Sequence, residues 1–463
     1  MPLENLAHQL AKSHTIARHP RRRIELVDRL QTQENLLRKA YRHFVEASEI
    51  RTPLSYAGEW LLDNYYVVQQ AIRQIREDMP SGYYRQLPKL SSSSLAGYPR
   101  IFDLAREVIS YSEFHINLDQ VTRFVNAYQY VVPLTMGELW ALPTMLRIVI
   151  VNSLSQLVAQ ATGIQGEKDK EAGPSFTSET DQLIDETNIA NCIRSLRMLA
   201  TQDWKTFFEN VSLVEQELRS DPANIYSRMD FETRDRYRKV VEDLAQASRK
   251  EEETIAQEAV WLAERAFQQG RSGTSEEGRS RDSHVGFYLL GDGCTHLENR
   301  LDYRPSWGLR WQRWLLNHPT PMYLSSIWLL SSLIISCIIG YAFIAGGGFA
   351  QLIVTGLLFL IPATAVSVQS INWLVPHLVP PRRLPRLDFQ DGISAEFRTI
   401  GVIPSLATDT DEVESLLHQL ELHFLGNADP YLHFALLTDY KDAPQKQMPE
   451  DDALLKRLKV GVQ

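Results

Sequence analysis

The stretches YLSSIWLLSSLIISCIIGYAFIA (Tyr323 to Ala345) and FAQLIVTGLLFLIPATAVSVQSINWLV (Phe349 to Val375) are long and apolar, and only three glycines separate them. No Asp, Glu, Lys or Arg occurs from Trp314 to Pro381. Each stretch exceeds the roughly 20 residues that a helix needs to cross a hydrocarbon core of about 30 Å. The sequence therefore predicts a transmembrane hairpin in region 314–381, with antiparallel spans at 323–345 and 349–375. The alternative is two helices buried in a large soluble core, but such helices seldom lack charges over two consecutive spans.

Basic residues flank the hairpin on both sides, whereas its glycine turn carries no charge. They are Arg300, Arg304, Arg310 and Arg313 before the first span, and Arg382, Arg383 and Arg386 after the second. Because positive residues stay on the cytoplasmic side of a membrane, both large flanking regions are predicted to be cytoplasmic. The N-terminus has no apolar h-region, so we expect no secretory signal peptide. The sequence thus predicts a multi-pass protein whose first partner is the lipid bilayer.

The composition excludes several classes of protein. The chain is 44% hydrophobic and 23% charged, which is typical of neither a disordered nor a collagen-like chain. It has 48 Lys+Arg against 57 Asp+Glu, and the resulting net charge of -9 argues against a nucleic-acid partner, which would need a basic surface. Cys192, Cys294 and Cys337 lie far apart, so neither a disulfide framework nor a zinc site is expected.

The region before the hairpin has the pattern of a helical protein. Apolar residues recur every three or four positions in two long segments, at Leu30, Leu37, Tyr41, Phe44 and Ala47 and at Leu61, Tyr65, Val68, Ile72 and Ile75. Further helices are predicted over 118–130, 138–161, 190–199 and 235–269. Polar, Gly- and Ser-containing linkers at 165–181 and 270–282 divide the region into an N-terminal helical part (1–164), a second helical part (182–269) and a pre-membrane segment (283–313).

The helical region shows no sign of catalysis. The dense charge run from Asp230 to Arg238 is interpreted as a solvated helix surface with i,i+4 pairs. His115, His284 and His296 lack metal-ligand spacing, so packing or surface roles are expected. The sequence contains neither a G-x-S-x-G elbow nor a P-loop. No catalytic or metal-binding residue is therefore assigned.

The pattern changes after the hairpin. Thr399 to Pro404 is a short, β-branched apolar run typical of a buried strand, and Tyr431 to Leu437 is another. A helical stripe from Val413 to Phe424 lies between them. Strand, helix and strand in this order predict a βαβ unit with parallel strands, at the start of an α/β domain over 382–463. Ligands of such sheets bind beyond the carboxyl ends of the strands, where Pro404, Ser405 and Asp439 are expected.

Several segments resemble one protein family. They are Glu59 to Leu90, Leu95 to Ile109, Pro133 to Arg147 and Asn191 to Glu242, followed beyond the spans by LPRLDFQDGISAEFRTIGVIPSL and YLHFALLTDYKDAPQKQMPEDDALL. All of them are similar to the N-terminal region of bacterial cyclic β-1,2-glucan synthases. The resemblance runs through nearly the whole chain and includes the entry into that family's glucosyltransferase domain.

This resemblance implies a function and a location. Family members are large enzymes of the bacterial inner (plasma) membrane that polymerise glucose from cytosolic UDP-glucose, elongate the glucan on the protein itself and cyclise it. Their transferase domain is similar to inverting GT-A glycosyltransferases, which implies UDP-glucose as the donor and Mg²⁺ or Mn²⁺ as a cofactor. By this similarity Pro404 and Asp439 would line the uridine pocket. The metal motif, the general-base carboxylate and the acceptor-site motif are implied to lie downstream of the matching segments.

The fold predicted from these observations is mainly α, with a helical cytoplasmic region and a two-helix membrane hairpin followed by the first βαβ unit of a GT-A-like domain. The predicted function is that of the membrane-anchoring N-terminal portion of a cyclic β-1,2-glucan synthase, inactive alone and working with a downstream catalytic region and its glucan product. The alternative is a non-catalytic membrane adaptor in a glycan-synthesis complex. A transporter component is disfavoured because neither span contains a charge.

Overall fold

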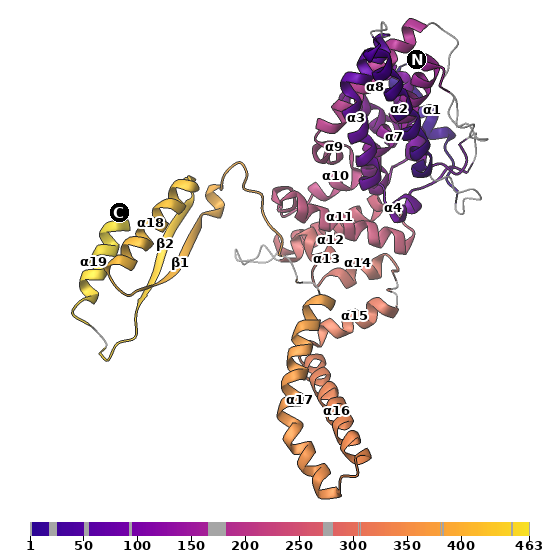
Figure 1. Ribbon diagram of the computed structural model, residues 1–463. Helices are drawn as coiled ribbons and strands as arrows, with labels where there is room; N and C mark the ends of the chain where they lie inside the picture. Colours follow the sequence, from indigo (N-terminus) through magenta and orange to yellow (C-terminus); the bar gives the residue numbers. More distant parts are fainter. Residues whose placement is uncertain are drawn as a thin grey trace. The chain divides into compact units, whose positions relative to one another are not determined.

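The structure is a computed structural model that describes residues 2–17, 26–50, 55–91, 95–164, 182–271, 281–303, 305, 307–379, 381, 384–445 and 448–462 (Figure 1). The described chain is mostly helical and contains one sheet of two parallel strands. The predicted linker at 165–181 lies outside the described residues, as does most of the one at 270–282. Arg304, Arg382 and Arg383 lie outside them too.

The chain forms two compact units. Unit 1 comprises residues 1–227 and 235–380, and unit 2 comprises residues 228–234 and 381–463. In unit 2 the short segment 228–234 pairs with chain that follows the hairpin, because Met229 forms an antiparallel bridge with Leu387. Arg228 also forms an ion pair of 2.9 Å with Glu396. Each unit is described separately below.

Unit 1 begins with a bundle of helices that contains both predicted helical parts. The helices are α1 (Leu3–Ser13), α2 (Leu26–Glu49), α3 (Tyr56–Asp78), α4 (Ser81–Gln86), α5 (Arg100–Tyr111), α6 (Leu118–Gln129), α7 (Met136–Thr162), α8 (Gln182–Thr201), α9 (Trp204–Val211), α10 (Leu213–Arg219), α11 (Phe231–Ser248) and α12 (Glu252–Arg271), with a short 3₁₀ turn η1 (Tyr226–Arg228). The first residues of α11 and the last of η1 belong to unit 2. Helix α7 packs against α2, α3, α5 and α8, so it forms the centre of the bundle.

The apolar periodicity predicted α3 correctly. All five residues of its seam, from Leu61 to Ile75, are buried. The seam of α2 is buried at Leu30, Leu37 and Phe44, and the ring of Tyr41 stacks on that of Tyr65 with a centroid separation of 4.3 Å. Helices α2 and α3 therefore pack through the faces that the spacing had marked.

The helix predicted over 235–269 is instead two helices, α11 and α12. Arg249 adopts a positive φ of 59°, which a continuous α-helix cannot contain, and α12 restarts at Glu252. Glu252 and Glu253 occupy the first turn of α12, where negative side chains are favoured by the exposed N–H groups. The turn places Glu252 against the start of α7, where its carboxylate accepts a hydrogen bond of 2.7 Å from the Met136 amide.

Four short elements precede the predicted membrane hairpin. These are η2 (Arg281–Ser283), α13 (Val285–Leu289), α14 (Cys294–Arg300) and α15 (Trp307–Asn317). The predicted spans then form α16 (Pro319–Ile344) and α17 (Phe349–Leu378), which pack side by side (Figure 1). Small side chains at Ser331, Ala363 and Ser367 are the ones buried along this pair, and the Tyr323 hydroxyl donates to the Asn372 side chain at 2.8 Å.

Unit 2 contains η3 (Ala395–Phe397), β1 (Thr399–Ala407), α18 (Thr410–Gly426), β2 (Leu432–Tyr440) and α19 (Asp451–Val462). The strands are parallel, in a register that runs from Thr399 opposite Leu432 to Ala407 opposite Tyr440. A small core of Ala407, Val413, Leu454 and Leu458 joins the sheet to both helices. The predicted strand–helix–strand order with parallel strands is therefore present, and both strands extend beyond their predicted ends.

Candidate functional site

The three residues predicted to bind nucleotide-sugar lie inside the strands of unit 2. Pro404 is opposite Leu437, Ser405 is opposite Thr438, and Asp439 is opposite Leu406. Exposure alternates along β1 from Ile400 onward, so exposed Pro404 and half-buried Ser405 lie on opposite faces of the sheet. The register places exposed Asp439 on the face of Pro404, while the face of Ser405 carries the helices. The structure thus brings Pro404 and Asp439 to neighbouring positions and separates Ser405 from them.

The Ser405 hydroxyl is buried and has no hydrogen-bond partner among the described residues. Asp439 accepts a hydrogen bond of 2.8 Å from the Tyr440 amide, so one of its carboxylate oxygens is engaged locally. These two positions offer an unused hydroxyl on one face and an accessible carboxylate on the other. Both groups can bond to the hydroxyls or base of a nucleoside.

The face that carries Pro404 and Asp439 is apolar and uncovered within unit 2. Ile400, Val402, Leu406 and Leu437 are each more than half exposed there. In parallel α/β sheets both faces are normally covered by helices. Helix α18 packs on the other face of this sheet, and α19 joins the small core beside it, so that face is covered.

Asp409 and Asp411 have the D-x-D spacing of the metal motif in the transferases that the resemblance implies, although that motif was expected downstream of the matching segments. The structure gives Asp409 a local role, because it is the N-cap of α18 and accepts a hydrogen bond of 2.9 Å from the Glu412 amide. Asp411 and Glu412 lie in the first turn of the same helix. No group of three or more His, Cys, Asp or Glu among the described residues is arranged to hold a metal ion. The divalent cation implied by the family resemblance therefore finds no fitting ligand set in the described part of the chain.

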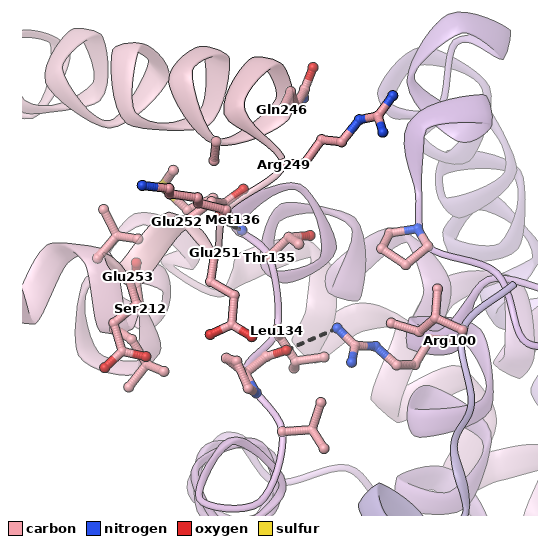
Figure 2. A pocket seen from close by; sticks show the side chains of 18 residues that line it. Arg100, Leu134, Thr135, Met136, Ser212, Gln246, Arg249, Glu251, Glu252 and Glu253 are labelled. Carbon is pink, nitrogen blue, oxygen red and sulfur yellow. Dashed lines mark hydrogen bonds between the residues drawn. The ribbon is translucent and has the colours of Figure 1, made fainter. Parts of the chain in front are cut away.

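Unit 1 contains a cavity of about 370 Å³ at the junction of its helices (Figure 2). Most of its lining comes from the start of α5, the turn before α7, the α9–α10 junction and the turn between α11 and α12, and Ile16 and Pro88 complete it. At one wall Arg100 forms two hydrogen bonds with Glu138, of 2.8 and 2.5 Å, and donates a third to the Pro133 carbonyl at 3.0 Å. This buried pair is satisfied by the protein itself, so the Arg100 charge is neutralised at the wall.

Glu252 is the most perturbed titratable group of this cavity. Burial raises its pKa to about 7, and the nearby Glu242 and Glu138 carboxylates act in the same direction, while the hydrogen bond from Met136 opposes the shift. A carboxyl group with such a pKa can exchange a proton near neutral pH. Its position at the N-terminus of α7 also gives it a structural role, since it occupies one of the first backbone N–H groups of that helix.

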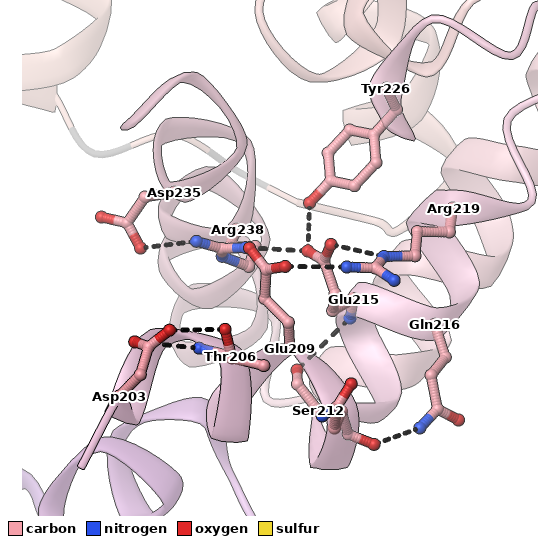
Figure 3. Close-up of polar contacts among 11 residues, drawn as sticks. Asp203, Thr206, Glu209, Ser212, Glu215, Gln216, Arg219, Tyr226, Asp235 and Arg238 are labelled. Atoms are coloured by element: carbon pink, nitrogen blue, oxygen red, sulfur yellow. Dashed lines mark hydrogen bonds and ion pairs between the residues drawn. The ribbon is translucent and has the colours of Figure 1, made fainter. Parts of the chain in front are cut away.

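A second polar cluster in unit 1 has a buried carboxylate at its centre (Figure 3). The buried carboxylate of Glu215 accepts hydrogen bonds from the Tyr226 hydroxyl at 2.7 Å and from Arg238 and Arg219, each at 2.8 Å. Burial alone would raise the pKa of Glu215, but the Arg238 charge and these hydrogen bonds hold it below its ordinary value. Arg238 belongs to the charge run that was interpreted as a solvated surface. That interpretation is wrong for Arg238, whose guanidinium is buried.

Asp221, His284 and Tyr237 form a chain of hydrogen bonds in unit 1. The buried Asp221 carboxylate accepts from His284 Nδ1 at 2.8 Å, and His284 Nε2 lies 3.2 Å from the Tyr237 hydroxyl. Although this order is that of a catalytic relay, Tyr237 is buried, and burial raises the pKa of its phenol to about 12. The terminal hydroxyl is neither accessible nor activated, so the chain serves to hold α13 to α11.

Three described helices are long and apolar enough to cross a membrane. In α7 the most apolar window is 89% buried inside unit 1. In α16 none of the corresponding window is buried, and in α17 only 6% is. The two predicted spans thus differ from α7 in burying almost none of their apolar residues.

The chain is similar in sequence to a known glucan synthase. No protein-family model matches the chain. The chain is 28% identical to the cyclic beta-(1,2)-glucan synthase NdvB of Rhizobium meliloti (strain 1021), in an alignment that covers 92% of this chain. It spans only 17% of the length of that relative. The predicted resemblance to the cyclic β-1,2-glucan synthases is therefore confirmed as sequence similarity over nearly the whole chain.

Proposed function

We propose that this chain is the membrane-anchoring part of a cyclic β-1,2-glucan synthase, and that unit 2 belongs to its UDP-glucose-dependent glucosyltransferase domain. The observation that carries the proposal is the similarity to NdvB, which extends over 92% of the chain and so includes most of both units. A glucan-synthesis role accounts for a helical body, an apolar hairpin and an α/β unit occurring in one chain.

The exposure of α16 and α17 supports the membrane assignment. Large apolar side chains on both helices face outward, among them Trp328, Leu333, Leu357 and Ile361. In water such a surface would far exceed the apolar patch of a few hundred Å² that monomeric soluble proteins tolerate. In a bilayer the same side chains contact lipid. We therefore propose a multi-pass protein of the bacterial inner membrane, with unit 2 and the part of unit 1 that precedes the hairpin on the cytoplasmic side.

The βαβ order of unit 2 supports the transferase assignment. In open α/β sheets ligands bind at the carboxyl ends of the strands. Asp439 is the last residue but one of β2, whereas Pro404 lies three residues before the end of β1, and both occupy the same face of the sheet. We propose that Asp439 accepts hydrogen bonds from the uridine of UDP-glucose and that Pro404 contacts the same nucleoside.

Inverting glucosyl transfer needs a base for the acceptor hydroxyl, and in the related transferases a divalent cation offsets the charge on the departing diphosphate. The described residues offer no fitting set for that cation. We therefore propose that a catalytic region outside these residues, on the same or a separate chain, supplies both groups, and that these 463 residues alone do not make glucan.

The test is glucose incorporation. Membranes from cells that express only this chain are incubated with radiolabelled UDP-glucose and a divalent cation, and the β-1,2-glucan formed is counted. We expect no incorporation above that of membranes without the chain, whereas the chain itself should remain in the membrane pellet after carbonate extraction. Robust synthesis would contradict the proposed inactivity, and a chain that washes into the supernatant would contradict the membrane anchor.

Binding of the donor can be tested separately. Saturation-transfer NMR of the detergent-solubilised chain should detect UDP-glucose, and Asp439→Asn should weaken this binding by roughly tenfold, as expected for loss of a hydrogen bond to a charged group. Asp442→Asn, in an exposed residue three positions further on, is the matched control. Equal signals from both variants would remove Asp439 from the proposed site.

A further inference from the structure

Helix α15, immediately before the hairpin, presents a stripe of three tryptophans to the outside. Trp307, Trp311 and Trp314 recur at i, i+4 and i+7, and their side chains are 81%, 52% and 43% exposed. Their rings stack in succession, with centroids 6.2 Å apart between Trp307 and Trp311 and 5.1 Å apart between Trp311 and Trp314. Nothing in the described part of unit 1 covers this continuous aromatic surface.

The polar side of α15 is held by the protein instead. Arg313 forms hydrogen bonds of 2.6 and 2.8 Å with the carboxylate of Glu298, a buried residue of α14. These hydrogen bonds raise the pKa of Arg313. Arg310, one turn earlier, donates to the Pro305 carbonyl at 3.1 Å. The arginine side is therefore fixed to the pre-membrane segment, which leaves the tryptophan stripe as the free side.

The chain breaks between α15 and the first span. His318 has non-helical angles (φ -124°, ψ 57°), and α16 starts with Pro319, which disfavours helical geometry in the residue before it. Without this break, α15 would simply extend the span. A single residue thus separates an exposed aromatic helix from the helix proposed to enter the bilayer.

We propose that α15 lies in the plane of the membrane interface, with its tryptophan stripe at the boundary between the lipid headgroups and the acyl chains. Tryptophan favours this boundary because its ring is apolar while its indole N–H can bond to headgroups. The occupant of the stripe is a phospholipid bilayer, because α15 is joined through His318 alone to α16, whose apolar residues are not buried by the protein. Helix α15 then sets the level at which the cytoplasmic part of unit 1 meets the membrane.

This inference rests on the proposed membrane hairpin, and spin labelling distinguishes the failure of one from the failure of the other. The full chain carries a single nitroxide in phosphatidylcholine–phosphatidylglycerol vesicles. The label is attached to native Cys337 of α16 in a Cys294→Ser background, or to Trp311→Cys or Asn317→Cys in a Cys294→Ser, Cys337→Ser background. Cys192 is buried and stays. Power saturation then measures collisions with oxygen, which enters the bilayer, and with a nickel chelate, which does not.

We expect the label at position 311 to lie about 5–10 Å below the headgroup surface, in line with other interfacial helices. Its collisions with nickel should be several-fold fewer than those of the label at 317, which lies on the polar side of the same helix. The label at Cys337 should lie deeper than both. Trp307→Cys, at the most exposed tryptophan, should reproduce the result for position 311.

Three results would overturn the inference. If labels at 311 and 317 collide equally with nickel while Cys337 is deep, the hairpin spans the membrane but α15 stands in water. If the label at 311 is shielded from both oxygen and nickel, protein and not lipid covers the stripe. If Cys337 itself collides freely with nickel, the membrane hairpin is wrong, and the proposed function fails with it.

Discussion

The carboxylate of Glu215 is the centre of a buried ion cluster in unit 1. It binds Arg238, Arg219 and Tyr226 at hydrogen-bonding distance, and both Glu215 and Arg238 are buried. Replacing Glu215 by Gln keeps the shape but leaves the guanidinium of Arg238 in a low-dielectric site without its main counter-charge. We expect the free energy of unfolding to fall by about 3–5 kcal/mol, as is usual when one partner of a buried pair is removed. The midpoint of urea denaturation, followed by tryptophan fluorescence in detergent, measures this loss.

Glu258→Gln is the matched control, because Glu258 pairs with Arg300 at a partly exposed site. Glu258→Gln should lower the free energy of unfolding by less than about 1 kcal/mol.

The pH dependence of the free energy of unfolding is an independent test of the Glu215 charge. The pKa of Glu215 is lowered in the folded protein, so its contribution is present above the unfolded value of 4.5 and is lost as the pH falls through the folded value. The gap between wild type and Glu215→Gln should therefore narrow in acid, and a constant gap would argue against a charge effect.

The stabilising contribution of Glu252 should depend on pH in the opposite sense to that of Glu215. Its pKa rises from 4.5 to about 7 on folding, so between these values the folded state binds more protons than the unfolded state. Its contribution is present below pH 4.5 and is lost as the pH rises to about 7. Glu252→Gln mimics the protonated form and still accepts from the Met136 amide. The variant should match wild type in acid and become more stable than wild type above pH 7 in denaturant titrations at successive pH values. Glu251→Gln removes an exposed charge from the same turn, and an equal profile for both variants would refute the role of burial.

Individual residues were the hardest to predict from sequence. Arg238 looked like one charge in a solvated run, and only the fold shows that it is buried against Glu215, which lies on α10. An ion pair between two helices has no characteristic spacing in the sequence.

At Pro404 the residue type led to a wrong prediction of the strand end. Proline was taken to end the strand, yet β1 continues to Ala407, because a proline on a strand with an unpaired edge need not remove a ladder hydrogen bond.

At the scale of elements, α7 resembles a membrane span in composition alone. Its 27 residues would extend about 40 Å, and its apolar window is 89% buried. Buried charges argue for a protein interior, since Glu138 pairs with Arg100, and Arg147 donates to the Leu199 carbonyl at 3.1 Å.

We expect both ends of α7 to lie on the same side of the membrane. Tyr130→Cys and Ala161→Cys, both at exposed positions, should react equally with an impermeant maleimide from one side, and reaction from opposite sides would make α7 a third span.

The strongly periodic helices could be predicted from sequence, whereas the breaks between them could not. The seam of α3 has an apolar residue at every third or fourth position, and all of its members are buried as expected. The break at Arg249 contains neither glycine nor proline, so no residue type in the sequence indicates it. Its cause is tertiary, because the restart at Glu252 places a carboxylate on the N-terminus of α7. The same limit applies to segment 228–234, which pairs with residues that follow the hairpin.

At the scale of the whole molecule, the hairpin was predictable because two uncharged runs need no tertiary information. The helices observed, Pro319–Ile344 and Phe349–Leu378, contain nearly all of the spans predicted at 323–345 and 349–375. The sequence predicted the strand–helix–strand order but not which strand residues share a face. Pro404 is opposite Leu437 and Asp439 is opposite Leu406, so Pro404 and Asp439 lie diagonally on one face and Ser405 lies on the other.

Topology is the prediction that tests the molecule as a whole. Arginines flank the hairpin on both sides while its turn is uncharged, so the turn alone should reach the far face of the membrane. The cysteine that reports on the turn is best placed at Gly348, because a side chain at Gly347 would meet the Ala342 carbonyl at 2.9 Å and Gly346 has a positive φ of 86°.

In a background without Cys294 and Cys337, Gly348→Cys should react with an impermeant maleimide in intact cells. Tyr130→Cys in unit 1 and Val460→Cys in unit 2, both well exposed, should react only after lysis. Reaction of Val460→Cys in intact cells would place unit 2 outside the compartment that contains UDP-glucose, and equal protection of all three positions would mean that the turn does not cross.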